Sequence, residues 1–297
     1  MKLNKIAAST ILAIVASSSF ADSVTDRIYQ SHVVNVGVRP SSTPVSYKLP
    51  NGQYVGEAID ICNHIFDKLK EKDPSLKLNY IEVSAKTRIP MLKEGKIDME
   101  CGSTTNSASR RKDVGFSIPY EIAGIGMVVA NNSKIHGFND NTISTVAYVD
   151  GTTATASVFS ANRGIQASWE GRKIKYVKGK DYLDTLALIE SGKADAFIGD
   201  DILLAGAIAQ SKDPSKFKLL PDKITTEPYG VMTTLESKDL QAVIDQTIIG
   251  LMNNGEFNKI YNKWFMQPIP PFNKSLNVQM SNPLKDVVRY PTNVVGN

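Results

Sequence analysis

A short phrase occurs twice in this chain, and the repeat limits the folds that the sequence can adopt. Residues 92–98 read Leu-Lys-Glu-Gly-Lys-Ile-Asp, and residues 189–195 read Ile-Glu-Ser-Gly-Lys-Ala-Asp. In each copy the glycine follows a helix-like segment and precedes an apolar stretch typical of a buried strand. The repeat predicts two similarly built lobes whose strands end at a shared cleft. The alternative is a chance similarity between two helix ends.

Helix-like and strand-like segments alternate around both copies. Strands are predicted at residues 33–38, 76–83, 97–101, 144–149, 174–177 and 194–198. Helices are predicted at residues 58–70, 240–251 and 257–265. Two more begin at residues 88 and 181 and end at Gly95 and Gly192, and another begins at about residue 154. Such alternation predicts an α/β architecture with largely parallel sheets.

The residues that follow one predicted strand are suited to hold a carboxylate. Residues 100–106 read Glu-Cys-Gly-Ser-Thr-Thr-Asn, and Arg110 follows at a predicted helix start. Free backbone N–H groups, hydroxyls and a guanidinium can converge on an anion there. In the second half, Gly199-Asp200-Asp201 also follows a strand and can hold an ammonium. Together the two phrases indicate a receptor for a free amino acid; two unrelated helix caps are the alternative.

The first 21 residues are predicted to be a signal peptide. Lys2 and Lys5 precede an apolar run at 6–15, and small residues lead to Ala21, after which we expect cleavage. The run is too short to span a bilayer, which argues against the alternative of a retained membrane anchor. We therefore expect the mature protein to be exported to the periplasm.

The charge balance argues against nucleic acid as a partner. The formal net charge is +4, from 34 Lys and Arg and 30 Asp and Glu. The basic residues form no long runs, so the sequence offers no continuous patch for a phosphate backbone.

Cysteine and histidine are scarce. Cys62 and Cys101 can form a disulfide in an oxidising compartment, because the helix at 58–70 is expected to cover the strand ending at Cys101. Two separately buried thiols are equally compatible with the sequence. His32, His64 and His136 are not spaced with further ligands in any metal-site pattern, so we expect neither a metal nor a cofactor.

Several phrases, in order along nearly the whole mature chain, resemble the amino-acid-binding periplasmic proteins of ABC importers, solute-binding protein family 3. The likeness is greatest to the glutamate/aspartate-binding members. The phrases are Val38-Arg39-Pro40-Ser41-Ser42, Arg88-Ile89-Pro90, residues 100–106, residues 200–206, Tyr229-Gly230, and residues 262–265 with 268–271.

The resemblance implies a type II periplasmic-binding-protein clamp. Each lobe would be a mostly parallel sheet flanked by helices, and two hinge strands would join the lobes. The implied boundaries are 22–119 and 230–297 for a discontinuous lobe 1, 125–224 for lobe 2, and 120–124 and 225–229 for the hinges.

The resemblance also implies a site for the backbone of an amino acid. Arg110 is similar to the arginine that clamps the α-carboxylate, with Ser103 and Thr105 as its hydroxyl and backbone partners. Asp200 is similar to the carboxylate that holds the α-ammonium. Thr152 and Thr153 match the turn that approaches from lobe 2.

A second group of residues matches the surroundings of the ligand's distal carboxylate. It comprises Arg39, Ser84 and Arg88. Where the close relatives have a histidine in a Lys-Asp-His phrase, this chain has Lys180-Asp181-Tyr182. A neutral and longer tyrosine would favour the shorter aspartate over glutamate; a surface tyrosine outside the site is the alternative.

The proposed charges favour a diacid. Three arginines and one or two aspartates would line the pocket, and a buried charge left unpaired costs several kcal/mol. Two alternatives remain for the distal arginines. Arg39 would be a solvated loop residue, and Arg88 would pair with Glu82 or Asp98.

The sequence therefore leaves two main functions to compare. The first is a monomeric receptor that delivers glutamate or aspartate to an inner-membrane ABC permease. The second is a secreted clamp-fold enzyme such as a cyclohexadienyl/prephenate dehydratase, which would need a general acid or base over its substrate. Only Glu100 and Glu227 are spare candidates for that role. A third function, a sensor domain or adhesin component, would usually need a membrane helix or anchor, which the sequence does not predict. The residues after 267 are expected to form an extended strap or a disordered tail.

Overall fold

The computed structural model describes residues 23–159, 165 and 169–294 of the chain. The predicted signal peptide, with its cleavage after Ala21, lies outside the described residues. Among the residues that are described, no helix combines the length and the apolar character needed to cross a bilayer.

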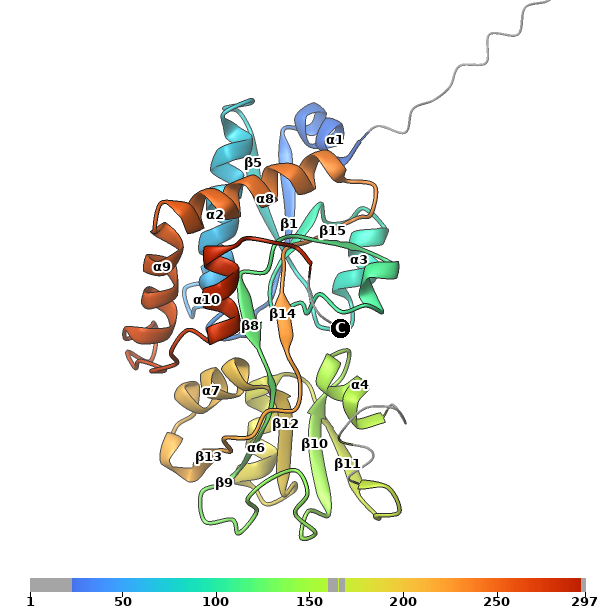
Figure 1. Cartoon of the computed structure of the whole chain (residues 1–297), viewed down its shortest axis with the longest axis vertical. Coiled ribbons are helices and arrows are strands. Elements are labelled where there is room, and N and C mark those ends of the chain that lie inside the picture. Colours follow the sequence, from blue (N-terminus) through green and yellow to red (C-terminus); the bar gives the residue numbers. More distant parts are fainter. Residues whose placement is uncertain (1–22, 160–164, 166–168, 295–297) are drawn as a thin grey trace, which may run out of the picture.

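Two five-stranded sheets lie at opposite ends of the molecule's long axis (Figure 1). The first sheet has the order β5-β1-β6-β15-β7, and the second has the order β11-β10-β12-β9-β13. The first comprises β1 (Val33–Val38), β5 (Lys77–Glu82), β6 (Met99–Cys101), β7 (Gly115–Phe116) and β15 (Met232–Thr233). The second comprises β9 (Ile125–Ala130), β10 (Thr145–Val149), β11 (Lys175–Gly179), β12 (Ala196–Asp200) and β13 (Phe217–Leu219).

The two sheets share one pairing scheme. β1 runs parallel to β5 and β6, and β10 runs parallel to β11 and β12. Beside these parallel cores, β15 is antiparallel to β6 and β7, and β9 is antiparallel to β12 and β13. The predicted two-sheet α/β architecture is confirmed, and the additional antiparallel strands make both sheets mixed.

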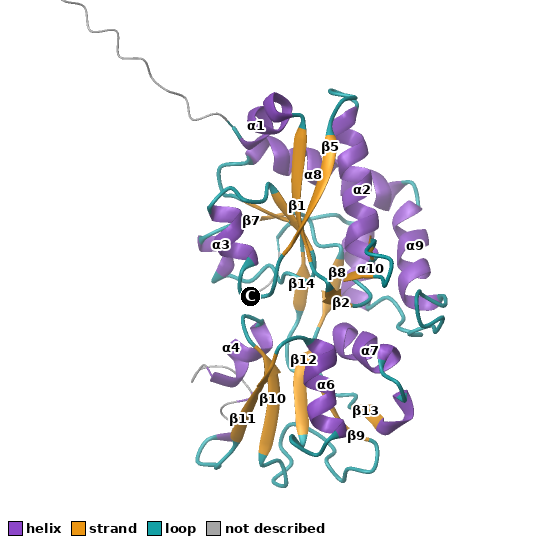
Figure 2. Cartoon of the chain, turned by 180° about the vertical axis from the view of Figure 1, so that it is seen from behind, coloured by secondary structure: helices purple, strands orange, loops and turns teal. Residues whose placement is uncertain are grey.

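Helices cover the sheets (Figures 1 and 2). Those around the first sheet are α1 (Val24–Ser31), α2 (Glu57–Lys70), α3 (Arg88–Lys93), α8 (Lys238–Asn253), α9 (Glu256–Tyr261) and α10 (Asn282–Arg289). Those around the second are α4 (Thr153–Phe159), α6 (Tyr182–Glu190) and α7 (Asp201–Gln210). A small three-stranded sheet is built from β2 (Ser41–Ser42), β3 (Ser46–Lys48) and β4 (Tyr54–Val55).

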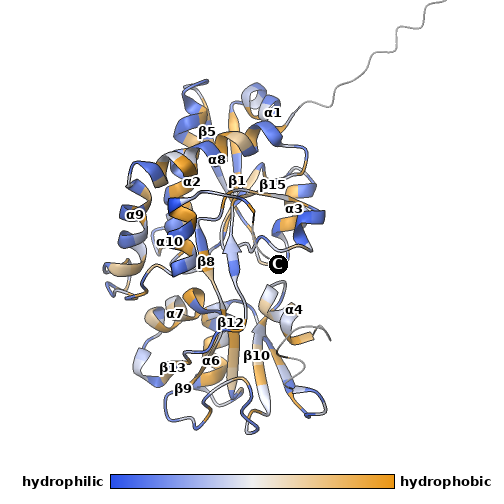
Figure 3. Ribbon diagram, in the orientation of Figure 1, coloured by the Kyte–Doolittle hydropathy of each residue, from blue (hydrophilic) through white to orange (hydrophobic). Residues whose placement is uncertain are grey.

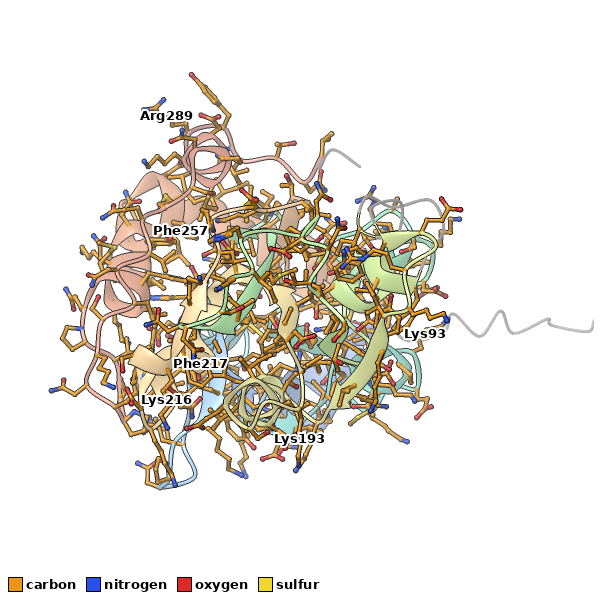
Figure 4. All side chains as sticks on the ribbon, turned by 90° about the horizontal axis from the view of Figure 1, so that it is seen from below. Lys93, Lys193, Lys216, Phe217, Phe257 and Arg289 are labelled. Carbon is orange, nitrogen blue, oxygen red and sulfur yellow. A yellow bond between two sulfur atoms is a disulfide. The ribbon has the colours of Figure 1, made fainter. Side chains whose placement is uncertain are left out.

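Helical spacing of apolar residues explains how the helices pack. In α2, Ile61, Ile65 and Leu69 lie on one face, and each is at most 1% exposed. Burying each such side chain contributes roughly 1.5–3 kcal/mol. Figure 3 shows the result as hydrophobic colour along β10 and β12 and mixed colour on helices such as α2 and α8. In Figure 4, Lys93 and Lys193 point outward from the rim, whereas Phe257 lies among the helices.

Two short strands connect the sheets. β8 (Glu121–Ala123) and β14 (Glu227–Tyr229) pair antiparallel midway along the molecule (Figure 1). The chain passes to the second sheet through β8 and returns through β14, so that β15 and α8–α10 rejoin the first sheet. Both strands fall within the ranges predicted for hinges; the lobe boundaries and the hinge motion stay predictions.

A disulfide joins Cys62 of α2 to Cys101 at the end of β6. Both cysteines are buried in the core around the first sheet. Of the two alternatives that the sequence left open, the structure has the bonded pair.

The C-terminal segment contains a helix rather than only an extended strap. α10 is amphipathic, its Leu284 is fully buried in the core, and it packs against α8 and β8. Pro283 in the first turn and a Ser281 hydroxyl that accepts the Leu284 N–H define its start.

Candidate ligand-binding site

A narrow cavity lies where the carboxyl ends of the parallel strands of both sheets meet. It is lined by Arg39, Arg88, Ser103, Thr105, Thr152, Thr153, Tyr182, Asp200 and Leu203. Open α/β sheets place their ligand sites at this end of the strands. The space within it is about 10 Å³, which is room for roughly one water. In this arrangement the two sides are therefore closed on one another.

Two larger hollows lie elsewhere on the surface. One of about 570 Å³ is bordered by residues 136–140 and 222–224, and one of about 290 Å³ by residues of α2 and α9. None of the predicted site residues borders either. We take the small cavity as the candidate site because charged groups of both signs converge on it.

Arg39 and Arg88 form the cationic side of the cavity. They are 5% and 2% exposed, and both reach Ser103: Arg39 Nη1 donates to the hydroxyl at 3.4 Å, and Arg88 Nη1 donates to the carbonyl at 2.9 Å. Burial and the neighbouring Arg88 lower the pKa of Arg39 to about 10, so it remains a cation at pH 7. The Nε atoms of both arginines are buried without a hydrogen-bond partner.

These positions exclude the alternatives for the two arginines. Arg39 is not a solvated loop residue. Arg88 does not pair with the predicted acids, because Glu82 binds Lys48 at 2.8 Å and Asp98 binds Arg27.

Arg110 bridges the two sides of the cavity. Its Nη1 donates to the Thr105 carbonyl at 3.0 Å, and its Nη2 donates to the Gly151 carbonyl at 3.2 Å. Thr105 belongs to the segment after β6, and Gly151 to the turn after β10. Burial, followed by repulsion from Arg88, lowers the pKa of Arg110 to about 10. Arg110 is half-buried beside the lining residues rather than among them.

Asp200 forms the anionic side. It ends β12, is 4% exposed, and accepts a hydrogen bond from the Tyr229 hydroxyl through Oδ2. Its Oδ1 is buried and has no partner. Burial and the nearby Glu227 raise the pKa of Asp200 to about 7, against the opposing effects of Tyr229 and Arg110.

Tyr182 is a wall of the cavity and not a surface residue. It is 3% exposed, and its hydroxyl oxygen accepts the Asp200 N–H at 3.2 Å. The ring lies against Gly199, where a Cβ atom would come within 2.7 Å of Tyr182 Cε1. The surface alternative for this residue was therefore wrong.

Thr152 and Thr153 reach the cavity from the side of the second sheet. The Thr153 hydroxyl lies 3.5 Å from that of Thr105 across the cavity. Thr152 accepts the Thr155 N–H and donates to the Val149 carbonyl, so its hydroxyl also caps α4.

Ser84, unlike Arg110 at the edge of the cavity, is a predicted residue that points away from it. It is exposed, and its hydroxyl accepts the Thr87 N–H while its own N–H donates to the Thr87 hydroxyl. This reciprocal pair shapes the turn before α3 and turns Ser84 away from the site.

Sequence reasoning missed two functional neighbours. Leu203 in the first turn of α7 lines the cavity, and its position three residues after Asp200 was the only available signal. Tyr229 was noted only within the Tyr-Gly phrase, although it is fully buried and holds Asp200. Asp201 lies beside the linking strands, where it accepts the Gly124 N–H and pairs with Lys223. Among the described residues, no cluster of three or more His, Cys, Asp or Glu is arranged to hold a metal.

Comparison with known proteins agrees with this geometry. The model of the bacterial extracellular solute-binding proteins, family 3, matches residues 34–267. The chain belongs to this family. A family member from Escherichia coli (strain K12), the glutamate/aspartate import solute-binding protein, is 32% identical over 98% of both chains. The L-glutamate/L-aspartate-binding protein of Pseudomonas aeruginosa is 32% identical over 95% of this chain and 94% of its own.

The family fold is also seen in solved structures. The cysteine-binding protein from Campylobacter jejuni superposes with a TM-score of 0.71 at 27% identity, over 82% of this chain and 92% of that one.

Proposed function

We propose that this family 3 protein is the receptor of an ABC importer and captures glutamate or aspartate in the cavity between its two sheets. The two bacterial relatives with 32% identity carry names that state this ligand pair. In this proposal the ligand contacts are made by Arg39, Arg88, Ser103, Thr105, Arg110, Thr152, Thr153, Tyr182 and Asp200.

One observation carries the proposal: buried polar atoms of both signs have no partner at the cavity. They are the Nε atoms of Arg39 and Arg88 and the Oδ1 atom of Asp200. Leaving a charge buried and unpaired costs several kcal/mol. A ligand with one ammonium and two carboxylates would supply partners for all of them.

The charge on the lining favours a diacid over a neutral amino acid. Arg39 and Arg88 contribute two positive charges, Asp200 contributes one negative charge, and Arg110 adds a third positive charge at the edge. Glu100 and Glu227 are buried outside the lining, where they act on Arg39 and Arg110 and offset part of this charge. Within the lining itself the arginines outnumber the acid, and a ligand with two carboxylates would match them.

Location and partners follow from the same proposal. The mature protein would work as a monomer in the periplasm, after removal of residues 1–21, and would deliver its ligand to an inner-membrane permease. Nucleic acid has no role in it.

Isothermal titration calorimetry against the common amino acids tests the proposal. The mature protein should first be unfolded in denaturant with the disulfide intact, dialysed and refolded, which removes ligand carried over from expression. We expect one-to-one binding of glutamate or aspartate with micromolar affinity or better. Tight binding of glutamine or arginine without any response to either diacid would disprove the ligand assignment.

The enzyme alternative receives no support from the site. Its candidate acid–base residues, Glu100 and Glu227, lie outside the cavity lining, and the relatives named above are binding proteins. Incubation of the protein with prephenate, with product detection, provides the direct check.

A further inference from the structure

Two glutamates are buried beside the strands that connect the sheets, away from the ligand cavity. Glu57 is the first residue of α2 and is fully buried; Glu121 begins β8 and is 2% exposed. Neither oxygen of Glu57 has a hydrogen-bond partner. In Glu121 one oxygen accepts the Ile122 N–H at 2.7 Å and the other has no partner. The proposed ligand binding uses neither residue.

The neighbouring acids already have cationic partners. Asp60 accepts hydrogen bonds from Lys263 at 2.6 Å and from Trp264 Nε1 at 2.7 Å. Asp201 pairs with Lys223. Among the described groups that face the pair, Lys223 is the only cation close enough to act on Glu121, and Asp201 holds it.

The remaining titratable groups around the pair cannot neutralise it. Tyr120 and Tyr261 face both glutamates and carry no positive charge. The N-terminus of α2 favours a negative charge on Glu57, but this effect is worth at most about 2 kcal/mol. Burying an unpaired carboxylate costs several kcal/mol, and a second negative charge in the same core adds to that cost.

We propose that Glu57 and Glu121 hold protons at neutral pH and make the core that α2 and β8 share sensitive to pH. Residues of α2 and of the β8 region lie in one buried core, and ionisation would place an unpaired negative charge at each glutamate within it. The same strand, β8, carries Glu121 opposite Tyr229 of β14, and Tyr229 binds Asp200. The pair therefore lies one strand away from the candidate site.

The direction of the titration follows from burial. Burial raises the pKa of Glu121 to about 8 and, together with Glu121, raises the pKa of Glu57 above its usual range. In the unfolded chain both groups titrate near pH 4.3. At pH values between about 4.3 and the raised pKa values of the folded state, the folded protein binds more protons than the unfolded chain. The free energy of unfolding therefore falls as the pH rises. The two groups titrate as a pair, and the observed values belong to the pair.

The first experiment measures unfolding of the full mature protein by denaturant from pH 5 to pH 9. For each proton held only by the folded state, the unfolding equilibrium constant should rise about tenfold per pH unit between about pH 5 and 8. In Glu57→Gln and in Glu121→Gln the folded state holds one proton fewer. The slope of the logarithm of the unfolding equilibrium constant against pH should therefore fall by about one in each variant. Glu71→Gln is the matched control, because Glu71 follows the same helix but is exposed and paired with Lys68. Equal slopes in all four proteins would overturn the proposal.

The second experiment needs no variant that folds poorly. Infrared difference spectra of the wild-type protein detect the C=O stretch of a protonated carboxyl group directly. Asp200, whose pKa is about 7, would contribute to the same band, so the spectra are recorded also on Asp200→Asn. In both proteins we expect the band at pH 6.5, well above the range of an ordinary glutamate, and its loss above pH 8. Its absence at pH 6.5 would overturn the proposal.

The third experiment tests whether the paired strands β8 and β14 become less stable when the two glutamates ionise. After correction for base catalysis, the amides of β8 and β14 should exchange faster above pH 8 in the wild-type protein and not in the glutamine variants. Unchanged exchange across pH 8 in the wild-type protein would contradict the coupling to β8. All three experiments use the ligand-free protein, so their outcome is independent of what the cavity binds.

Discussion

Arg39 and Arg110 are both cations at the cavity, yet they have different partners. Arg39 makes one long contact, at 3.4 Å, and keeps an unpartnered Nε. Arg110 already donates to two main-chain carbonyls. A ligand carboxylate would complete the hydrogen bonding of Arg39, whereas at Arg110 it would replace or share existing bonds.

We expect Arg39→Ala to weaken binding of the diacids by about thirtyfold or more and to affect their amides far less. Removing one member of a buried charge pair costs roughly 2–5 kcal/mol. Arg110→Ala should weaken all amino acids alike, because it removes the partner of the common α-carboxylate. Calorimetry with glutamate, aspartate and their amides measures both effects. Normal glutamate binding by Arg39→Ala would remove Arg39 from the distal site.

Asp200 should make ligand binding dependent on pH. Its pKa of about 7 in the ligand-free cavity means that part of the protein carries a proton there at neutral pH. An ammonium group favours the ionised carboxylate, so binding releases that proton and weakens as the pH falls. Between pH 8 and pH 6 we expect about a tenfold loss of affinity, measured by calorimetry in buffers of different ionisation enthalpy.

Two variants test whether Asp200, rather than another carboxylate, causes the pH dependence of binding. Asp200→Asn should bind far more weakly and lose the pH dependence. Glu190→Gln removes an exposed carboxylate paired with Lys216 on the same side of the molecule and should behave like the wild-type protein. A pH profile that survives in Asp200→Asn would assign the titration to another group.

Tyr182 should set the length of the ligand. Its buried ring fills space between Asp200 and the distal arginines, so Tyr182→His should enlarge the cavity and shift preference from aspartate toward glutamate. Tyr182→Phe keeps the volume and should leave the ratio of the two affinities near its original value. Competition between labelled aspartate and glutamate provides the measurement. The same ratio in all three proteins would place the selectivity elsewhere.

At the scale of elements, the disulfide fixes α2 to the strand that leads into the site. It closes a loop between residues separated by 39 positions, for which chain entropy predicts about 4 kcal/mol, at the upper end of the typical contribution of about 2–4 kcal/mol. Replacing both cysteines by serine should therefore lower the melting temperature by roughly 5–15 °C. Reduction of the wild-type protein should have a similar effect, and the same reductant should leave the serine variant unchanged. Equal melting temperatures before and after verified reduction would contradict this expectation.

The elements that the sequence revealed are those with a strong local pattern. The strand at 33–38 was located to the residue, and α2 began one residue before its predicted start. The antiparallel strands β9 and β13 were missed, because their pairing depends on contacts with distant strands rather than on local alternation. The helix α10 was missed although Leu284, Val287 and Val288 have helical spacing, because so short an apolar stripe gives little signal within a polar tail.

The residues of the candidate site also differ in how well the sequence predicts them. Residues at strand ends, such as Ser103 and Asp200, could be predicted from the local pattern, whereas a role for Arg88 came only from the family resemblance. Ser84 could not, since its direction depends on a turn in which it bonds Thr87. Tyr229 binds Asp200 from a distant part of the chain, and no local pattern reports such a contact.

At the scale of the whole molecule, the two sides meet through close contacts as well as through the cavity. The Thr43 hydroxyl donates to Gln210 at 3.4 Å, and Lys86 lies 3.7 Å from Asp150. Gly206 of α7 packs directly on the backbone near Thr43. The two sides thus form a closed arrangement, and we propose that it opens about β8 and β14 to admit the ligand.

Gly206→Ala should prevent this closure. A Cβ at Gly206 would lie 2.0 Å from the Thr43 carbonyl oxygen, a contact that only separation of the two sides relieves. Small-angle scattering should show a radius of gyration that stays large when glutamate is added, whereas the wild-type value should decrease. Gly250→Ala is the matched control, since a Cβ at that helical glycine meets nothing within 4 Å. Normal compaction of Gly206→Ala with ligand would contradict a closed state of this geometry.

The small size of the closed cavity has a kinetic consequence. With room for about one water, the closed form cannot admit an amino acid by diffusion, so ligand reaches the site only in molecules that have opened. At low ligand concentration the observed association rate should rise in proportion to concentration. At high concentration it should level off at the rate of opening, and that plateau would be the same for glutamate and aspartate because it belongs to the protein alone.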